Sequence, residues 1–287
     1  MSFTDPHDMH DLAIWVLGWD DEGVSRQAKM FQSQGYPNVF QHIDRNHHEA
    51  QNVNICIDRS AERGFKFFHM CNDDVVYRYP ETLPAMYDYI KTHPDVGAIH
   101  PWIEGEDADP SQEPYEFYLQ DATSILIRLD MNGWLPMLDE EYLFIGWVDL
   151  DWGMDINRHG MKVINDRRYP VKHLLDRTKS RSKKPFLFAM ERRNRLILTM
   201  KWDVVGISKW HGVEEYNKTV PIEKKIPTMY EIANYTAEEQ VLFGHSLVYE
   251  HPPIYKMDGQ VDPTLYWESP IITGRNIREM WEQGWRP

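Results

Sequence analysis

The sequence predicts an α/β fold, with a mixed but mostly parallel sheet flanked by helices. Over about the first two thirds of its 287 residues, apolar runs of strand length alternate with segments whose apolar residues recur at helical spacing. Neither an internal repeat nor a low-complexity tract interrupts this alternation. Such a pattern is typical of a sheet whose strands are joined by helices.

The first elements follow from local patterns. The run LAIWVLG at 12–18 suits a buried strand, and helical spacing of apolar residues predicts a helix over 22–34. Gly35 ends that helix, and a second strand is expected over 39–43. Together these segments predict a strand, a helix and a second strand in sequence.

The same pattern continues through the next third of the chain. A helix is expected over 49–63, where Gly64 ends it, and the aromatic run 65–70 is expected to form a buried strand. Pro80 opens a further helical pattern, and 96–100 is strand-like. These elements add a second helix layer and two strands.

Later elements have weaker signals. A polar, proline-containing stretch over 104–118 is expected to be a surface loop. We expect strands at 124–128, 162–165 and 169–171, and helices at 150–158 and 186–200. Two short helices are also expected, one after Thr236, which forms a capping-box pattern with Glu239, and one after Thr273. Scattered prolines and aromatic residues after residue 202 suggest an extension that packs on the main domain.

Composition argues against several classes of protein. A formal net charge of -14 disfavours a protein whose main task is to bind a polyanion through counterion release. No apolar run approaches the length of a membrane span, and the polar, acidic N-terminus does not resemble a signal peptide, so we expect a cytosolic protein. Cys56 and Cys71 lack metal-ligand spacing and are expected to be buried thiols.

Acidic residues follow the third predicted strand. Asn72, Asp73 and Asp74 stand at its carboxyl end, which is where open α/β sheets bind ligands. Adjacent carboxylates repel each other unless a cation holds them, and hard divalent cations prefer oxygen ligands. The alternative is an ordinary turn, because Asn and Asp are favoured residues for leaving a strand.

Four segments in order carry a family resemblance. They are Gln34-Gly35-Tyr36-Pro37, Ile43-Asp44, Gln51-Asn52-Val53-Asn54-Ile55 and Asn72-Asp73-Asp74. This stretch resembles family 2 glycosyltransferases of the GT-A fold, although Asn54 replaces the usual Gly and Asn72 replaces the first acid. The resemblance implies that Asp44 binds the pyrimidine of the donor, with Asn52 on the donor side. It also implies that Asp73 lies beside the ribose or metal, and that Asp74, with Asn72, holds Mn²⁺ or Mg²⁺.

A second acidic pair lies at the start of the helix predicted near 150–158. Asp149 and Asp151 suit helix capping, and at a spacing of two only one of them can easily face a shared site. With Arg158, Gly160 and Val171-Lys172-His173, the segment resembles the Glu-Asp-x-Asp-Leu-x-x-Arg element of the same family, with Val148 in place of Glu. The resemblance implies that Asp149, or alternatively Asp151, is the general base and that His173 is a metal ligand.

A basic stretch follows His173 in this otherwise acidic chain. Arg181 and Lys183 lie in a flexible-looking segment that could close over a donor diphosphate, or could simply be a solvated cationic loop. The following Arg192-Arg193-Asn194-Arg195 is similar to a helix of rhamnosyltransferase-like members of the family. We therefore assign Arg181 and Lys183 to donor binding.

The resemblance implies an inverting nucleotide-sugar transferase. Residues 1–202 would form the GT-A catalytic domain, and 203–287 an extension on the acceptor side or at an oligomer contact. We expect a UDP- or dTDP-linked donor and a glycan acceptor, with modified bases of DNA ranked lower. The alternatives are a nucleotidyltransferase, which the acidic Gly18-Trp19-Asp20-Asp21-Glu22 disfavours, and a non-catalytic nucleotide-sugar-binding protein.

Overall fold

The computed structural model describes residues 3–103, 107–117, 119, 121–131, 133–143, 146–174 and 185–245. Arg181, Lys183 and the helix expected after Thr273 lie outside these ranges. Contacts divide the chain into a first unit, Met1–Asp139 with Asp149–Arg177, and a second unit, Glu140–Val148 with Thr178–Pro287. The division of roles predicted at residue 202 stays a prediction.

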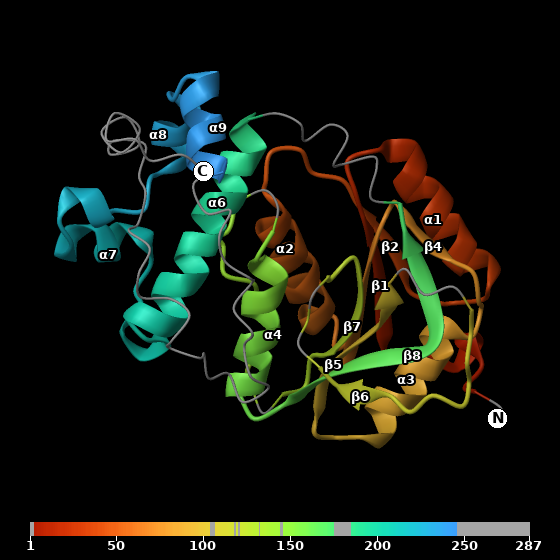
Figure 1. Ribbon diagram of the computed structural model, residues 1–287. Coiled ribbons are helices and arrows are strands. Elements are labelled where there is room, and N and C mark those ends of the chain that lie inside the picture. The colour runs from red at the N-terminus through yellow and green to blue at the C-terminus, as the bar shows by residue number, and fades with distance from the viewer. Residues whose placement is uncertain are drawn as a thin grey trace. The chain divides into compact units, whose positions relative to one another are not determined.

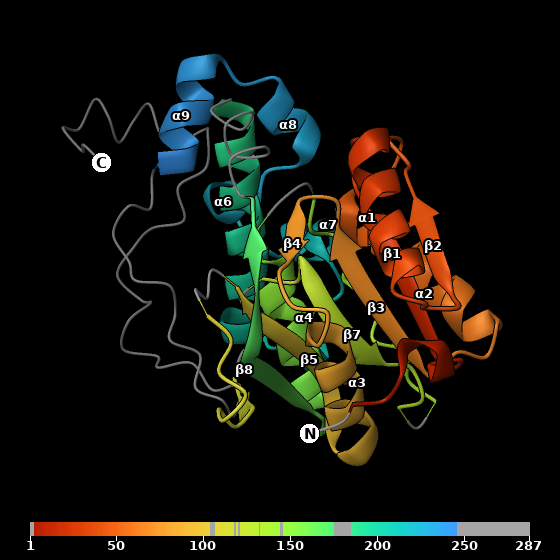
Figure 2. The same ribbon diagram turned by 90° about the vertical axis from the view of Figure 1, so that its right-hand side faces the viewer.

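The first unit is built on an eight-stranded mixed sheet. Its strands are β1 (Leu12–Leu17), β2 (Val39–His42), β3 (Phe67–Asn72), β4 (Val75–Tyr77), β5 (Val96–Ile103), β6 (Tyr115–Glu116), β7 (Ser124–Arg128) and β8 (Lys162–His173). The order is β2-β1-β3-β7-β5-β8-β4, with β6 paired to β8 (Figure 2). β1, β2, β3, β5 and β8 run one way, and β4, β6 and β7 run the other. The predicted α/β class with a mixed, mostly parallel sheet is confirmed.

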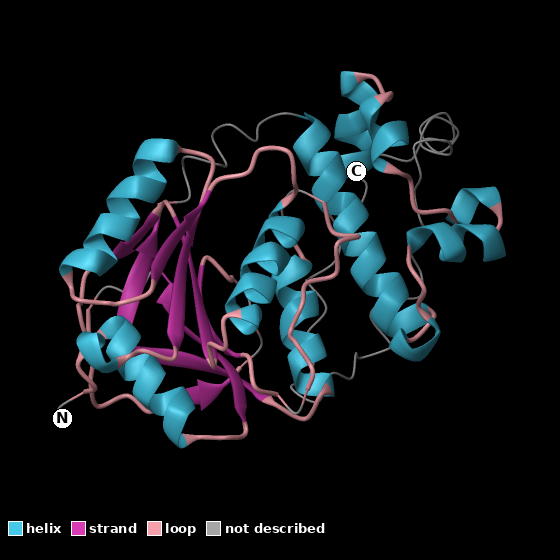
Figure 3. Ribbon diagram, turned by 180° about the vertical axis from the view of Figure 1, so that it is seen from behind, coloured by secondary structure: helices cyan, strands magenta, loops and turns pink. Residues whose placement is uncertain are grey.

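Helices cover both faces of this sheet. They are α1 (Asp21–Ser33), α2 (Glu49–Glu62), α3 (Thr82–Thr92) and α4 (Val148–Arg158). α1 and α3 lie on one face, and α2 and α4 on the other (Figures 1 and 3). The apolar face predicted for α1 is in the core, since Val24, Ala28 and Phe31 are at most 1% exposed. Burial of a side chain the size of Val or Phe contributes about 1.5–3 kcal/mol, which fixes the helix on the sheet.

The structure corrects the sequence prediction in the second half of the sheet. The two strands expected at 162–165 and 169–171 are one continuous strand, β8. The segment expected to be a loop contains β6, and β4 was not predicted. Both missed strands are only two or three residues long, so they exist through pairing with β8 and carry no periodicity of their own.

The second unit is helical in its described part. It contains α6 (Pro185–Thr199), which continues as a π-helical turn over Met200–Val204, then α7 (Val213–Thr219), α8 (Met229–Ala233) and α9 (Ala237–His245). α9 packs against α6. The predicted cap is confirmed: Glu239 N donates to Thr236 Oγ1 at 3.2 Å, and Thr236 N donates to Glu239 Oε2 at 2.8 Å. Short 3-10 turns occur in this unit at Ile207–Lys209 and Ile222–Lys224, and another occurs in the first unit at Pro6–Asp8.

Two expectations from composition can be compared with the structure. Cys56 and Cys71 are free and buried, as predicted. In the residues that the structure describes, no helix has both the length and the apolar character needed to cross a bilayer.

Candidate active site

The acidic turn between β3 and β4 directs its two carboxylates to different neighbours. Asp73 N donates to Leu17 O at 3.0 Å, and the Asp73 carboxylate accepts from Asp20 N at 3.3 Å. A β-carbon added at Gly18 would overlap the Asp73 carboxyl group, so this glycine lets the turn lie against the β1–α1 loop. Burial and the nearby charge of Asp74 raise the pKa of Asp73. Asp73 therefore belongs to the edge formed by β1 and α1.

Asp74 faces His173 instead. The pairing of β4 with β8 sets Val75 opposite His173, and the Asp74 Oδ1 to His173 Nε2 distance is 3.3 Å. On the other side of the imidazole, His173 Nδ1 is 3.3 Å from Asp121 Oδ2. Burial acts to lower the pKa of His173, but the two carboxylates raise it to about 9. The ring is thus held between two acids.

Glu49 and Asp149 complete this cluster. Glu49 is the first residue of α2, and Asp149 lies in the first turn of α4. Burial, followed by the charges of Asp121 and Asp74, raises the pKa of Glu49 to about 7. Burial, followed by Asp121 and Glu49, raises the pKa of Asp149 well above its usual range, although the Ala122 backbone N–H donates to its carboxylate. Two carboxylates therefore contact the imidazole, the charges of Glu49 and Asp149 act on the same cluster, and repulsion among the four acids favours a cation there.

The residues around His173 fit one divalent cation with few protein ligands. Metal-binding histidines usually donate their second ring N–H to a carboxylate, and the Nδ1 contact with Asp121 provides that arrangement. Nε2, on the other side of the ring, lies 3.3 Å from Asp74 Oδ1. Within the described residues, no group of three or more His, Cys, Asp or Glu side chains is placed to hold a metal ion. A cation here would have one carboxylate and one imidazole as protein ligands, and substrate phosphates and water would complete its coordination.

Asp44 lies at the same edge of the sheet as Asp73. β1, β2 and β3 are parallel, and Leu17 is in register with both His42 and Asn72, so the three strands end together. The Arg45 guanidinium joins the loops after β1 and β2, because it donates to Trp19 O at 3.1 Å and pairs with Asp21 at 3.2 Å. Trp19, which sequence reasoning did not select, is 54% exposed here.

Asn52 holds the loop that carries Asp44. Its Nδ2 donates to Asp44 O at 3.0 Å and to His47 O at 3.2 Å, and its Oδ1 is 2.8 Å from His42 Nε2. The Asn46 backbone N–H and the His47 ring lower the pKa of Asp44, which accepts from both. Asn52 thus holds the loop after β2 in place, at the sheet edge where the donor nucleotide was predicted to bind.

Two other predicted residues have different surroundings. Asp151 is 2% exposed, and the charges of Asp121 and Glu49 act on Asp149. The choice between the two acids stays a prediction. Asn72 is the last residue of β3, and its backbone N–H donates to Thr123 O at 2.9 Å. Strand alternation puts its side chain on the face opposite Cys71.

Asp121 and Glu49 were missed by sequence reasoning. Asp121 precedes β7 in an irregular segment, where its Oδ1 accepts from Thr123 N at 2.9 Å, so locally it looks like a turn residue. Glu49 looks like a helix N-terminal acid, which is common for electrostatic reasons. Neither residue lies in one of the family-like motifs. Only a survey of every acidic residue near the end of a predicted strand or the start of a predicted helix would have selected them.

Asn54, which departs from the family pattern, binds a neighbouring loop. Its Nδ2 donates to Leu138 O at 2.9 Å, and Leu138 N donates to Asn54 Oδ1 at 2.8 Å. From α4, Trp152 Nε1 donates to Pro136 O at 2.7 Å. The segment before α4 is therefore fixed by both helices on this face of the sheet.

The Arg-Arg-Asn-Arg helix has a structural task within the second unit. Arg193 donates to Pro227 O at 3.0 Å and to Glu141 O at 2.7 Å, and the Asn194 amide bonds to the backbone of Leu143. Trp147 has a positive φ of 69°, which is strained for an aromatic residue, and Arg195 lies over its ring at 5.2 Å. α6 thus holds the Glu140–Val148 segment within the second unit.

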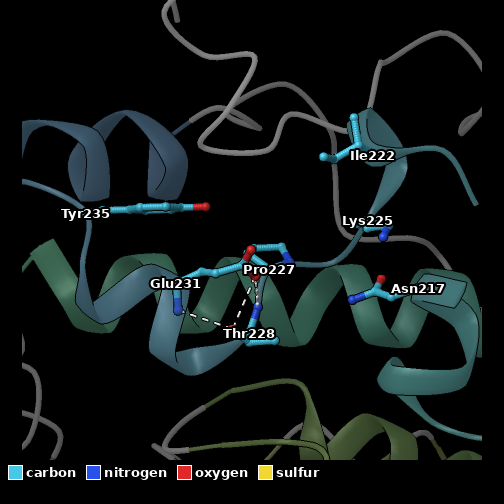
Figure 4. A pocket seen from close by; sticks show the side chains of 7 residues that line it. All are labelled: Asn217, Ile222, Lys225, Pro227, Thr228, Glu231 and Tyr235. Carbon is cyan, nitrogen blue, oxygen red and sulfur yellow. Dashed lines mark hydrogen bonds between the residues drawn. The ribbon is translucent and has the colours of Figure 1, made fainter.

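The second unit also contains a pocket of about 380 Å³. It is lined by Asn217, Ile222, Lys225, Pro227, Thr228, Glu231 and Tyr235. Tyr235 lies on one side and Asn217 and Lys225 on the other (Figure 4). Its one carboxylate, Glu231, accepts from Thr228 N at 2.8 Å as a helix cap. The lining therefore offers no acid–base pair comparable to the cluster around His173.

Comparisons with known proteins give structural likeness only. No protein-family model matches the chain, and no curated protein matches it significantly. The mannosyltransferase PcManGT from Pyrobaculum calidifontis, in complex with GDP-Man and Mn²⁺, aligns with a TM-score of 0.46 and 10% identity, over 86% of this chain and 78% of that one. TarS from S. aureus aligns with a TM-score of 0.41 and 13% identity, over 94% and 92%.

A third structure is the catalytic domain of Drosophila β1,4-galactosyltransferase 7 in complex with xylobiose. It aligns with a TM-score of 0.42 and 16% identity, over 58% of this chain and 72% of that one. All three TM-scores are below 0.5 and all three identities below 25%, so none of these similarities assigns an activity to the chain.

Proposed function

We propose that this chain is a GT-A glycosyltransferase that uses a divalent metal and moves a sugar from a nucleoside diphosphate to an acceptor hydroxyl with inversion. The observation that carries the proposal is the placement of His173 between Asp74 and Asp121, beside Asp149. Asp74, Asp149 and His173 come from distant parts of the chain, and each was selected by its place in a family-like motif.

The donor nucleotide would lie along the carboxyl ends of β1, β2 and β3. Asp44 would bind the pyrimidine and Asp73 the ribose, while Asn52 holds the Asp44 loop. The N-terminus of α1 already carries Asp20 and Asp73, which leaves it unsuited to a phosphate. This disfavours the nucleotidyltransferase alternative and supports a pyrophosphate placed further along, near Asp74.

Mn²⁺ or Mg²⁺ would be held by Asp74 and His173, with Asn72 nearby, and would neutralise the charge that develops on the departing nucleoside diphosphate. Asp121 orients the His173 ring through Nδ1 and so keeps Nε2 directed at Asp74. Arg181 and Lys183 remain proposed diphosphate contacts.

Asp149 is the proposed general base. Burial, followed by the charges of Asp121 and Glu49, raises its pKa, which makes its carboxylate a stronger base. General-base catalysis contributes typically about 10²–10⁴-fold in rate. Asp151 is the second choice, since its side chain is 2% exposed. A single base is sufficient for direct displacement at the sugar carbon, which inverts its configuration. The presence of the proposed metal acid Asp74 disfavours the non-catalytic alternative.

The substrates follow from the resemblance and from charge. We propose a UDP- or dTDP-linked sugar, including the rhamnosyl type, and a glycan acceptor. A nucleic-acid acceptor ranks lower because the chain carries a net charge of -14.

A panel of nucleotide sugars, scored by release of nucleoside diphosphate with and without Mn²⁺, tests the proposal. We expect metal-dependent release from one uridine or thymidine donor, and its loss in Asp74→Ala. Asp58→Ala, exposed on α2, is the matched control and should retain activity. Failure of every such donor to turn over or to bind in a metal-dependent way would refute the assignment.

A further inference from the structure

Away from the acidic cluster, an exposed arginine is held between two aromatic rings. The Arg167 guanidinium carbon lies 4.2 Å from the centre of the Trp102 ring and 4.7 Å from the centre of the Tyr115 ring. These residues come from three strands that lie side by side, β5, β6 and β8 (Figure 1). Both rings are within cation–π distance of the guanidinium, and its N–H donors lie in the plane of that group.

Arg167 differs from its neighbour in what it binds. Arg168 has partners within the protein, because it pairs with the buried Asp166 at 2.7 Å and donates to Ala85 O at 3.0 Å. Arg167 makes no hydrogen bond or ion pair in the part of the chain that the structure describes.

The sheet places this group on the same face as the candidate active site. Tyr115 is opposite Asn165 in the β6–β8 pair, and Asn165 contacts His100 at 3.3 Å. Ile99 and Ile164 lie in the core with residues of α1 and α3. Strand alternation therefore turns His100, Asn165 and Arg167 to the other face of the sheet, where α4 carries Asp149. Arg168 points instead to α3 on the other face.

The separation from the reacting groups can be counted along β8. Arg167 is six residues before His173 in this strand, at most about 20 Å at the usual rise per residue. An oligosaccharide acceptor whose hydroxyl reaches Asp149 could extend over this length to Arg167.

We propose that Arg167, clamped by Trp102 and Tyr115, binds an anionic group of the acceptor, a carboxylate or a phosphate. The inference rests on the proposed function for its substrate. A stacked guanidinium is already positioned by its rings, so it loses little freedom on binding, and its fork matches both anions in a bidentate manner. The site thus selects an acidic glycan over a neutral one.

Direct binding tests this without requiring turnover. The probes are trigalacturonic acid for a carboxylate, glucose 6-phosphate for a phosphate, and neutral maltotriose, each titrated by calorimetry at low salt. We expect one anionic probe to bind at least about tenfold more tightly than maltotriose, and Arg167→Ala to remove that difference. The probe whose binding depends on Arg167 shows whether the acceptor group is a carboxylate or a phosphate. Arg167→Lys should recover only part of it, because an ammonium group lacks the fork.

Arg63→Ala is the matched control, since Arg63 is an exposed arginine stacked at 4.8 Å on a single ring, Phe40. It should leave anion binding unchanged. Equal binding of all three probes, or unchanged anion binding in Arg167→Ala, overturns the inference. Donor hydrolysis measured in parallel separates the two proposals: Arg167-dependent anion binding without any donor turnover keeps this site and rejects the transferase.

Discussion

The Asp121 carboxylate lies 3.3 Å from Nδ1 of His173. The opposite nitrogen of the same ring faces Asp74 Oδ1, also at 3.3 Å. Asp121 therefore orients the imidazole through Nδ1, and Asp74 lies beside Nε2. A carboxylate on one ring nitrogen, with the other nitrogen left for the metal, is the arrangement expected of a metal-binding histidine. Asp121 and Asp74 thus contact the imidazole from opposite sides of the ring.

Removing this orienting contact should weaken metal binding. Asp121→Asn keeps an acceptor but loses the charge, and Asp121→Ala loses both. We expect Mn²⁺ affinity to fall about 10–100-fold, more in the alanine variant. Titration of Mn²⁺ followed by electron paramagnetic resonance measures this without turnover, with Asp130→Asn, an exposed acid, as control. Unchanged affinity in Asp121→Ala would show that the ring is held by other contacts.

Changing the proposed base should separate binding from transfer. In Asp149→Asn, donor affinity should stay near the parent value while transfer falls about 10²–10⁴-fold, because only proton acceptance is lost. Single-turnover transfer and donor titration measure the two effects. Asp155→Asn on the same helix is the control, as that acid pairs with Arg158. Transfer at the parent rate in Asp149→Asn would exclude this residue as the base.

The Asn54 bonds to Leu138 should contribute measurably to stability. Asn54→Ala leaves a buried N–H and C=O without their partners, so we expect the free energy of unfolding to fall by about 2–4 kcal/mol. Urea unfolding gives this value. Gln32→Ala, exposed on α1, removes an amide without such contacts and should change it little. A loss no larger than that of the control would mean that the loop is fixed elsewhere.

The buried His69 should make the protein sensitive to acid. Burial lowers the pKa of His69 to about 3, whereas an exposed histidine titrates near 6.5. The unfolded chain therefore binds a proton that the folded chain excludes, and stability is lost as pH falls from about 6.5 toward 3. At pH 4.5 this group accounts for about 2.5 kcal/mol.

Urea unfolding at pH 6.5 and 4.5 checks this value. His69→Gln can still bond to the Tyr77 hydroxyl, which lies 2.9 Å from His69 Nε2, and should lose less stability on acidification. His10→Gln, exposed near the N-terminus, should behave as the parent. Identical losses in His69→Gln and the parent would place the acid sensitivity in other groups.

Local patterns predicted most of the first unit. The helices that became α1 and α2 were expected within one residue at each end, because their apolar faces repeat regularly and Gly35 and Gly64 follow them. β4 and β6 could not be found in this way. Each is two or three residues long and forms only because β8 passes beside it.

The sequence by itself determined the α/β class and selected Asp74, Asp149 and His173 as candidates, since strand ends and helix starts are local features. Only the tertiary structure brought Asp121 and Glu49 beside them and assigned Arg193 and Asn194 to holding backbone. Asp121 and His173 are 52 residues apart, and such an approach depends on sheet pairing. Periodicity describes how each segment folds, but the meeting of side chains across a sheet is set by the packing of all its strands.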